Sequence, residues 1–127
     1  MEKIYSDFDF TFTNNVSTGI SKIINADSVN QSIKNILMTN KGEIPFNPMF
    51  GSKLNHLLFE PINAVTTALI KDEILTALNN FEPRIKIEEI KVEELYDEKA
   101  YKILLKYILL YFNESVIIEF KLKLKGV

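Results

Sequence analysis

The chain has 127 residues, the length of one ordinary domain, and its 46% hydrophobic and 25% charged residues are typical of a globular protein. It contains no cysteine, which excludes disulfides and cysteine-ligated metals, and its single histidine, His56, leaves no second histidine for a zinc or iron site. The formal net charge of −2 argues against nucleic acid as the main partner, because binding to phosphates requires a basic face.

The sequence lacks the apolar stretches that membrane insertion and export require. The run "YILLYF" is far shorter than a membrane span. The N-terminal "MEKIYSDFDF" carries acids and aromatics where a signal peptide has an apolar stretch. We therefore expect intracellular synthesis and no membrane insertion.

Residues 1–26 show no sustained hydrophobic period. Phe8, Phe10 and Phe12 alternate with polar residues, which indicates a short extended segment, and "TNNVSTG" is typical of a loop. We expect an extended N-terminal arm over residues 1–26, attached to a single domain that accounts for the rest of residues 1–127.

A first helix is expected to begin near Asp27 or Ser28. Ser28 and Gln31 have the spacing of a capping box, and Asn40 and Gly42 supply the stop. The apolar residues that follow the cap fall on one helical face: Val29, Ile33, Ile36 and Leu37.

The stretch "KGEIPFNPMFGSKLNHLLFEP" is the densest in turn residues. Pro45 and Pro48 bias the residues before them to extended conformations, which favours an ordered loop. Several of its side chains are too apolar for a freely solvated linker: Ile44, Phe46, Met49 and Phe50. Two interpretations stay open, a docking loop and a buried connector whose prolines define its path.

Two further helices are predicted. A short one spans about residues 52–59, with Leu54, Leu57 and Leu58 inward, and ends at Pro61. The next runs from an Asn63 cap to about Phe81. Its inward face comprises Ile70, Ile74, Ala77, Leu78 and Phe81, with Leu75 at the border. Val65 and Leu69 lie off this face and indicate a second contact near the start of the helix.

The hydrophobic period then changes from 3.6 to 2, which predicts strands over residues 85–96, 100–112 and 115–125. The turns "YDEK" and "NES" indicate an antiparallel meander. A slip in the apolar phase between Ile87 and Ile90 predicts a bulge near Glu88 and Glu89. The middle strand, apolar on both sides, should be central and covered. The predicted fold is α+β, with three main helices packed on a three-stranded antiparallel β-meander.

The lysines of the final "KLKLK" admit more than one use. Phosphate binding is one. Lysines on the outer face of a terminal strand more often discourage edge-to-edge aggregation. A third possible use is in assembly, in which this last strand, or its edge, accepts a strand from a partner.

The triplet Glu82-Pro83-Arg84 contains the only arginine of the chain. Pro83 forces Glu82 out of the helical region, and Arg84 offers a planar fork for bidentate contacts that lysine cannot imitate. One interpretation is an internal pair of Arg84 with Glu82 or Glu60 at the corner between helix and strand. The other is a contact with a partner chain.

Catalytic alternatives have little support in the sequence. Glu60 with Glu82, or Asp72 with Glu73, supplies the two carboxylates that glycoside hydrolysis requires. Seventeen acids in 127 residues make such pairs easy to find, however, and no tryptophan is present to stack on a sugar. His56 has no recognisable serine or cysteine nucleophile beside it and is best interpreted as a surface or boundary residue.

With these residues set out, the sequence resembles the small baseplate wedge proteins of contractile phage tails, the sheath initiators, whose relatives include a baseplate subunit of type VI secretion systems. The similarity runs from about Ser32 to Tyr96, through "SIKNILMTNKGEIPFNPMFGSKLNHLLFEPIN" and "ALNNFEPRI", and "YSDFDFTF" is similar to the opening of some members. The positions that match are Gly42, Phe46, Pro48, Phe50, Gly51, Leu54, Leu58, Phe59, Glu60, Glu82, Pro83 and Arg84.

The resemblance implies an assembly role without catalytic residue, cofactor or metal. It implies that Glu82, Pro83 and Arg84 contact the wedge chains of the core bundle, and that the strands template the first sheath ring by strand sharing. Phe46, Pro48, Phe50 and Glu60 are further candidate partner-binding residues. The expected setting is a hetero-oligomeric tail baseplate or an equivalent injection apparatus.

Two alternatives remain beside this expectation: a peptidoglycan-degrading, lysozyme-like hydrolase and a free-standing regulatory adaptor on the same scaffold.

Overall fold

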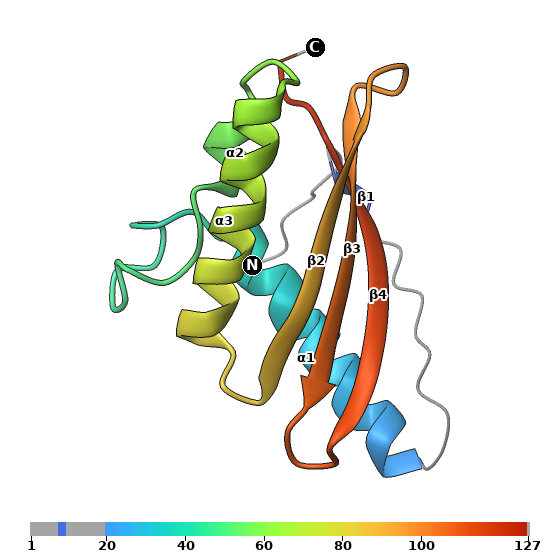
Figure 1. Ribbon diagram of the computed structural model, residues 1–127. Coiled ribbons are helices and arrows are strands. Elements are labelled where there is room, and N and C mark those ends of the chain that lie inside the picture. The colour runs from blue at the N-terminus through green and yellow to red at the C-terminus, as the bar shows by residue number, and fades with distance from the viewer. Residues whose placement is uncertain (1–7, 10–19, 127) are drawn as a thin grey trace.

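The computed structural model describes residues 8–9 and 20–126 of the chain. Three helices, α1 (Ile20–Met38), α2 (Leu54–Leu57) and α3 (Ala64–Phe81), pack against one antiparallel sheet (Figure 1). The strands are β1 (Phe8–Asp9), β2 (Ile85–Leu95), β3 (Ala100–Leu109) and β4 (Glu114–Lys123), and the sheet order is β1-β4-β3-β2. The predicted α+β fold and three-stranded meander are confirmed, and the two-residue β1 adds a short fourth strand beside β4.

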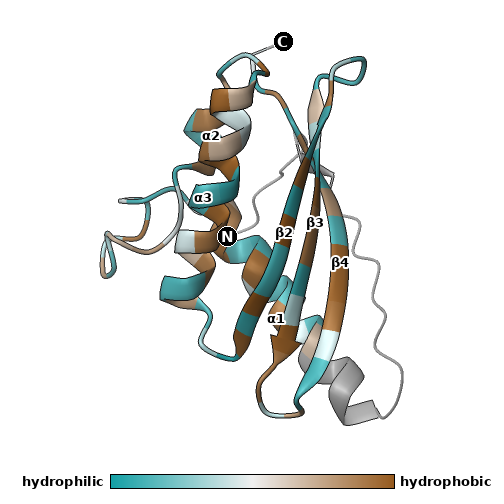
Figure 2. Cartoon of the chain, in the orientation of Figure 1, coloured by the Kyte–Doolittle hydropathy of each residue, from teal (hydrophilic) through white to brown (hydrophobic). Residues whose placement is uncertain are grey.

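One face of the sheet is buried and the other is partly open to solvent. Brown and teal segments alternate along β2 and β4 in Figure 2, as a half-buried strand requires. The inward residues of β3 and β4 are fully or almost fully buried: Tyr101, Ile103, Leu105, Tyr107, Leu109, Val116, Ile118, Phe120 and Leu122. They form a single core with the inward faces of the helices.

The middle strand β3 lies between β2 and β4, as predicted, and among the described residues the helices cover only one of its faces. On the other face Leu104 and Ile108 alternate with Lys102 and Lys106, and all four are half-buried. The expected full cover of both faces is therefore not found within residues 8–9 and 20–126, and the half-buried lysines alternate with the apolar residues in the way that aliphatic stems allow.

The predicted bulge in β2 is confirmed. Ile87 pairs with Tyr107 and Glu89 with Lys106, so Glu88 is the additional residue. The bulge shifts the side-chain alternation by one position. Ile87 before the bulge and Ile90 after it therefore both pack towards the core.

The helix α3 follows its prediction closely. The Asn63 side chain caps it by accepting a hydrogen bond from the backbone N–H of Thr66 at 2.8 Å. Its inward face buries Ile70, Ile74, Ala77 and Leu78, with Leu75 and Phe81 half-buried beside them.

The helix α1 begins at Ile20, seven residues before the expected Asp27. Ser28 lies inside it, so the predicted capping box was wrong, and residues 20–26 of the expected extended arm are helical. The segment 20–26 contains no glycine or proline that would stop a helix, and Ser28 instead accepts a hydrogen bond from Arg84. Residues 1–7 and 10–19 of the arm lie outside the described residues.

The helix α2 is only four residues long, shorter than the predicted 52–59, and turns continue it to Glu60. Leu54 and Leu58 are buried as predicted, whereas Leu57 is only half-buried.

The loop between α1 and α2 is closed by its own backbone. The N–H of Gly42 donates to the carbonyl of Pro48 at 2.7 Å, and that of Ser52 to the carbonyl of Thr39 at 2.9 Å. Gly51, at the closure, has a φ of +112°. A Cβ there would lie 2.3 Å from the carbonyl oxygen of Thr39, so the closure requires glycine.

We expect Gly51→Ala to lower the free energy of unfolding by about 3 kcal/mol, through backbone strain and overpacking together. Gly42→Ala is the matched control, because Gly42 also has a positive φ but a Cβ added there would meet no atom within 4 Å. It should cost only about 1–2 kcal/mol. Urea unfolding followed by circular dichroism measures both, and equal losses would contradict the role of the close approach at Gly51.

Candidate functional site

The triplet Glu82-Pro83-Arg84 forms the corner between α3 and β2. The backbone N–H of Glu82 still donates to the carbonyl of Leu78 at 2.9 Å, but its φ of −126° and ψ of 86° leave the helical region. Pro83 explains this change, because its ring disfavours the helical conformation for the residue before it. The chain is thereby turned from α3 into the first residue of β2.

Glu82 and Arg84 form a bidentate ion pair across this corner. Arg84 Nε donates to Glu82 Oε2 at 2.8 Å, and Nη2 donates to Oε1 at 2.9 Å. The Glu82 side chain is 2% exposed and that of Arg84 44%. The carboxylate is therefore inside the protein, while the guanidinium extends from it to the surface.

The corner also holds α1. Arg84 Nη1 donates to the hydroxyl of Ser28 at 3.0 Å, and Glu82 accepts a hydrogen bond from Ser32 one turn further along. Nearby, the buried hydroxyl of Tyr107 on β3 donates to Asn30 Oδ1 of α1 at 2.7 Å. The polar side chains of α1 thus connect that helix to both the corner and the sheet.

The pair is charged at neutral pH. Burial by itself raises the pKa of Glu82, but hydrogen bonds from Arg84 and Ser32 and the charge of Arg84 outweigh it, so the pKa lies below its ordinary value of 4.5. The hydrogen bond to Glu82 raises the pKa of Arg84. Burial, with a smaller effect of the Glu82 charge, raises the pKa of Tyr107, which therefore stays neutral.

The arrangement shows the internal pair between Arg84 and Glu82. It is also compatible with a contact between Arg84 and a partner chain. A guanidinium has five N–H donors. Three bonds from the side chain of Arg84 stay within the chain, and nearly half of that side chain faces solvent. The role of Glu82, Pro83 and Arg84 in partner binding remains a prediction.

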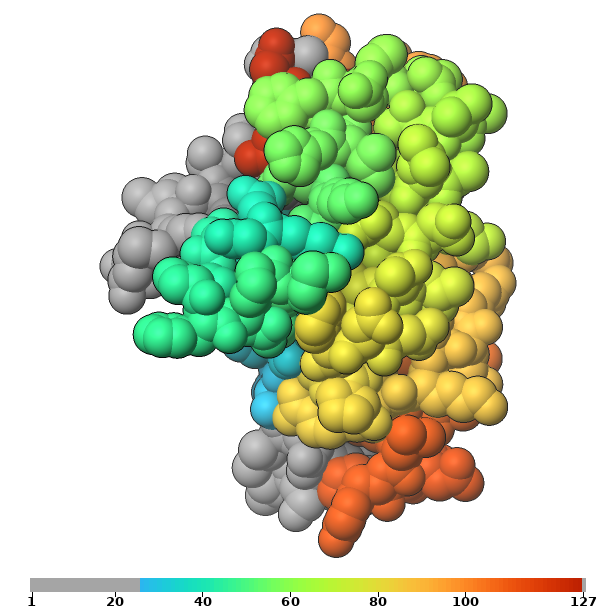
Figure 3. Space-filling model, turned by 90° about the vertical axis from the view of Figure 1, so that its left-hand side faces the viewer, coloured from blue at the N-terminus to red at the C-terminus, as the bar shows by residue number. Residues whose placement is uncertain are grey.

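Two exposed residues of the β3–β4 hairpin lie beside Arg84. The N–H of Leu110 donates to the carbonyl oxygen of Arg84 at 3.0 Å, and the next residue, Tyr111, is 90% exposed. The ring of Tyr111 stands edge-on to that of Phe112, with centroids 5.0 Å apart. Figure 3 shows this hairpin, in orange, projecting below the yellow corner.

Leu110 and Tyr111 were not predicted to be surface residues, because the strand expected over residues 100–112 contains them, whereas β3 ends at Leu109. A signal was available in "LLYF", which continues the apolar run up to the residues of the turn.

The remaining predicted partner-binding residues lie at opposite ends of α3. Phe46 is 98% exposed, Pro48 is exposed, and Phe50 packs on Phe81 with centroids 5.1 Å apart, which places this loop near the corner. Glu60 is exposed at the other end, before the first residue of α3. Because 18 helical residues span about 27 Å, Glu60 does not join the corner.

The same separation bears on the carboxylate pairs considered for hydrolysis. The two catalytic carboxyl groups of a glycosidase stand within about 10 Å of each other, whereas Glu60 and Glu82 lie beyond opposite ends of α3. Of the other pair, Glu73 accepts a hydrogen bond from the backbone N–H of Lys53 at 2.8 Å. Within the described residues, no three acidic or histidine side chains gather as metal ligands do.

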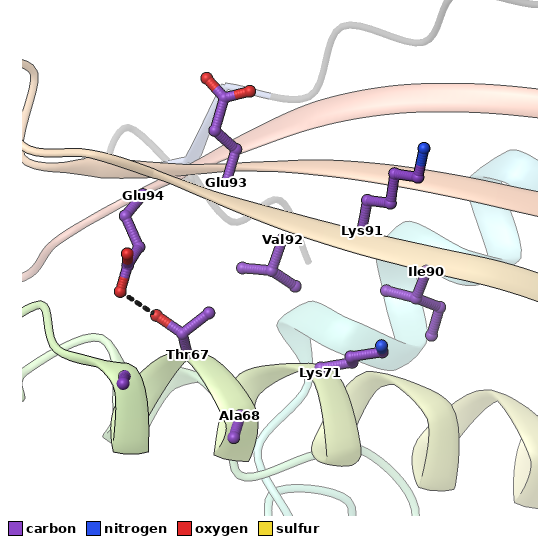
Figure 4. Close-up of a pocket in the computed structure, with 9 residues that line it drawn as sticks. Thr67, Ala68, Lys71, Ile90, Lys91, Val92, Glu93 and Glu94 are labelled. Carbon is purple, nitrogen blue, oxygen red and sulfur yellow. Dashed lines mark hydrogen bonds between the residues drawn. The ribbon is translucent and has the colours of Figure 1, made fainter.

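A groove of about 630 Å³ runs between α3 and β2. Figure 4 shows Ile90, Val92 and Glu94 directed towards α3, while Lys91 and Glu93 point away from it. Thr67 of α3 donates to Glu94 Oε2 at 2.6 Å at one end of the groove. In the described part of the chain β2 pairs only with β3, so its outer edge is an edge of the sheet.

We expect Glu82→Gln to lower the free energy of unfolding by about 2–3 kcal/mol at pH 7, because it removes one member of a buried ion pair. Since the folded-state pKa of Glu82 is below its ordinary value, its contribution to stability is present above about pH 4.5 and is lost as the pH falls through the folded-state pKa. Urea unfolding at pH 7 and pH 3 should therefore give a smaller difference between variant and parent at the lower pH.

The control is Glu98→Gln, which removes an exposed pair with Lys121 at 2.8 Å. It should change stability by less than about 1 kcal/mol. A loss at Glu82 no larger than at Glu98, or one that does not shrink at low pH, would contradict a stabilising role for the corner pair.

None of the described helices combines the length and apolarity that crossing a bilayer requires.

Comparison with known proteins gives consistent matches. The family model "Baseplate wedge protein gp25" matches residues 25–111. Baseplate wedge protein gp25 of Enterobacteria phage T4 is 33% identical over 98 residues, which cover 77% of this chain and 74% of the T4 protein.

Two solved structures have the same fold. A protein assigned provisionally as a tail lysozyme, from Geobacter sulfurreducens, is 26% identical with a TM-score of 0.72, and the match covers 87% of this chain and 97% of that one. A chain of the postcontracted baseplate of pyocin R2 is 22% identical with a TM-score of 0.58, over 78% of this chain and 98% of that one, which is a likeness of fold. The chain therefore belongs to the baseplate wedge protein family of contractile tails.

Proposed function

We propose that this chain is a structural subunit that joins the core-bundle chains of the baseplate wedge to the sheath and initiates sheath assembly. The observation that carries this proposal concerns the side chain of Arg84. Hydrogen bonds to Glu82 and Ser28 orient this side chain, and 44% of it is still exposed. A group that is already ordered loses little conformational entropy when a partner binds. Arg84 is thus prepared for an intermolecular contact.

The chemistry of the corner defines what a wedge chain would present to it. The outer N–H groups of Arg84 favour carboxylate or carbonyl oxygens, because a guanidinium donates in a planar fork. Leu110 and Tyr111 lie alongside and would enter apolar depressions of the partner. Tyrosine and arginine are the residue types in which binding energy is most often concentrated.

The sheath contact is assigned to the outer edge of β2. Residues 90–95 follow the bulge as a regular strand, with the groove beside them for alternate side chains of an added strand. Main-chain hydrogen bonds would supply the affinity of such an addition, and the groove its register. The opposite edge suits this role less, because β4 already pairs with β1 at Leu122 and Lys121.

The lowered pKa of Glu82 also agrees better with a structural role than with hydrolysis. A general acid for glycoside cleavage requires a raised pKa, whereas the pKa of Glu82 is lowered. We therefore propose that the chain is not an enzyme, although the relative from Geobacter sulfurreducens carries a lysozyme name.

We expect Arg84→Lys to reduce affinity for the wedge proteins of the same apparatus by at least tenfold, because one ammonium cannot replace a planar fork. Tyr111→Ala tests the same surface without altering the ion pair and should also weaken binding. Co-purification and titration of the purified proteins measure both, with melting curves run alongside.

The control is Lys86→Arg, an exposed change two residues away that should leave binding within twofold. If both Arg84→Lys and Tyr111→Ala bind normally, and Arg84→Lys melts at a lower temperature, the role of Arg84 is only to stabilise the corner between α3 and β2. That result would refute the wedge contact proposed here.

We expect Ala68→Trp to block sheath assembly while the wedge contact persists. Ala68 is an exposed residue of α3 that lines the groove beside β2, so a large side chain there would obstruct an added strand. Sheath polymerisation on purified baseplates, followed by electron microscopy, measures the effect. Gln31→Trp on the exposed side of α1 is the control, and normal sheaths from Ala68→Trp would exclude this groove as the docking place.

A further inference from the structure

A second exposed apolar surface lies between α2 and α3 and extends along α3 from its first residues to Thr76. Two adjoining hollows of about 360 and 560 Å³ share Leu57 of α2 and Leu69 of α3 as their common wall. Val65 lines the larger hollow and is 68% exposed. We call these three residues and the two hollows the α2–α3 face. Figure 3 shows this side of the molecule, with α2 and the start of α3 in green.

Val65 and Leu69 lie outside the core, whereas Leu57 is half-buried and packs against it with part of its side chain. The inward side of α3 already buries Ile70, Ile74 and Leu78, whereas Val65 and Leu69 project from another side of the same helix. Adjoining apolar side chains on a surface mark interaction sites more often than isolated ones do. The second contact that the sequence predicted near the start of α3 would lie here.

The rim of the face is predominantly acidic. Glu60 lines the larger hollow, and Asp72 and Glu73 line the smaller one, against a single basic residue, Lys53. One carboxylate oxygen of Glu73 already accepts a hydrogen bond from the backbone N–H of Lys53. A complementary partner would therefore carry lysine or arginine beside its apolar residues.

The shape of the face favours a helix as the occupant. The walls of the face are the helices α2 and α3, whose backbone groups pair along the helix except at the ends, so the face offers no strand edge to an added strand. Two hollows on either side of one ridge fit two side chains three or four residues apart on a helix. A second copy of this chain fits poorly, because it would place acidic rim against acidic rim.

We propose that the α2–α3 face binds an amphipathic helix of another baseplate subunit, with two apolar side chains in the hollows and flanking Lys or Arg on Glu60 and Asp72. This inference rests on the proposed function, since it takes the partner from the same assembly. It adds a second contact centred on Leu69, which lies 12 residues, or about 18 Å along α3, before the end of the helix at Phe81. The two contacts together would define the orientation of the subunit.

The test places the photoreactive residue benzoylphenylalanine at position 65 of the full chain. The probe is the set of purified baseplate subunits of the same apparatus, at subsaturating concentration. The expected product joins position 65 to a helix of another subunit, next to apolar residues three or four apart and within one turn of Lys or Arg. Asp72→Lys and Leu69→Gln should each lower the yield of this product at least tenfold.

Asp97 in the β2–β3 turn serves as the matched control, because it is exposed and acidic but lies outside the face. Asp97→Lys makes the same change in charge as Asp72→Lys and should keep the yield within twofold. A yield at position 65 no higher than from benzoylphenylalanine at position 97 would overturn the inference. Crosslinks to a second copy, to an extended strand or to an acidic segment would do so too.

The outcome also separates this inference from the proposed function. If the chain joins the other subunits but position 65 gives no such product, only the α2–α3 face is refuted. If the unmodified chain joins none of them, the proposed function fails and this inference fails with it.

Discussion

The buried carboxylate of Glu82 is the constraint on which the arrangement of this molecule depends. An ionised group with 2% exposure is tolerated only when it is paired and hydrogen-bonded, and Arg84 and Ser32 meet that need. Since these partners come from the start of β2 and from α1, satisfying one charge joins three elements. The same bonds orient the guanidinium of Arg84 at the surface, where we propose that it contacts a partner chain.

The helix α3 separates the surfaces that we assign to assembly. The corner with Arg84 follows its last residue, the α2–α3 face lies beside α2 and extends along α3 to Thr76, and the groove beside β2 runs along another side of the helix. Because α3 packs on the core through Ile70, Ile74 and Leu78, these surfaces keep a constant relative placement. If the chain joins several neighbours, as we propose, this rigidity would favour assembly, since less order has to be created when each partner binds.

Much of the fold was predictable because it depends on local patterns. The period of apolar residues identified α3 and all three strands of the meander. The phase slip after Ile87 located the bulge, because a strand with one buried face must keep its apolar residues on that face, and an additional residue is needed where the alternation slips. The start of α1 was not predictable in this way. The hydroxyl of Ser28 is used by Arg84, 56 residues later, instead of by the end of its own helix.

The sequence by itself determined the α+β class, the elements of the meander and the identity of the lone Arg84 as an unusual residue, because periodicity, turn residues and composition are local properties. Only the tertiary structure decided that Glu82 is buried, that Arg84 is both paired and exposed, and that Leu110 and Tyr111 of a distant hairpin lie beside it. Those facts depend on which elements pack together. Such contacts between residues far apart in the chain leave no periodic trace in the sequence.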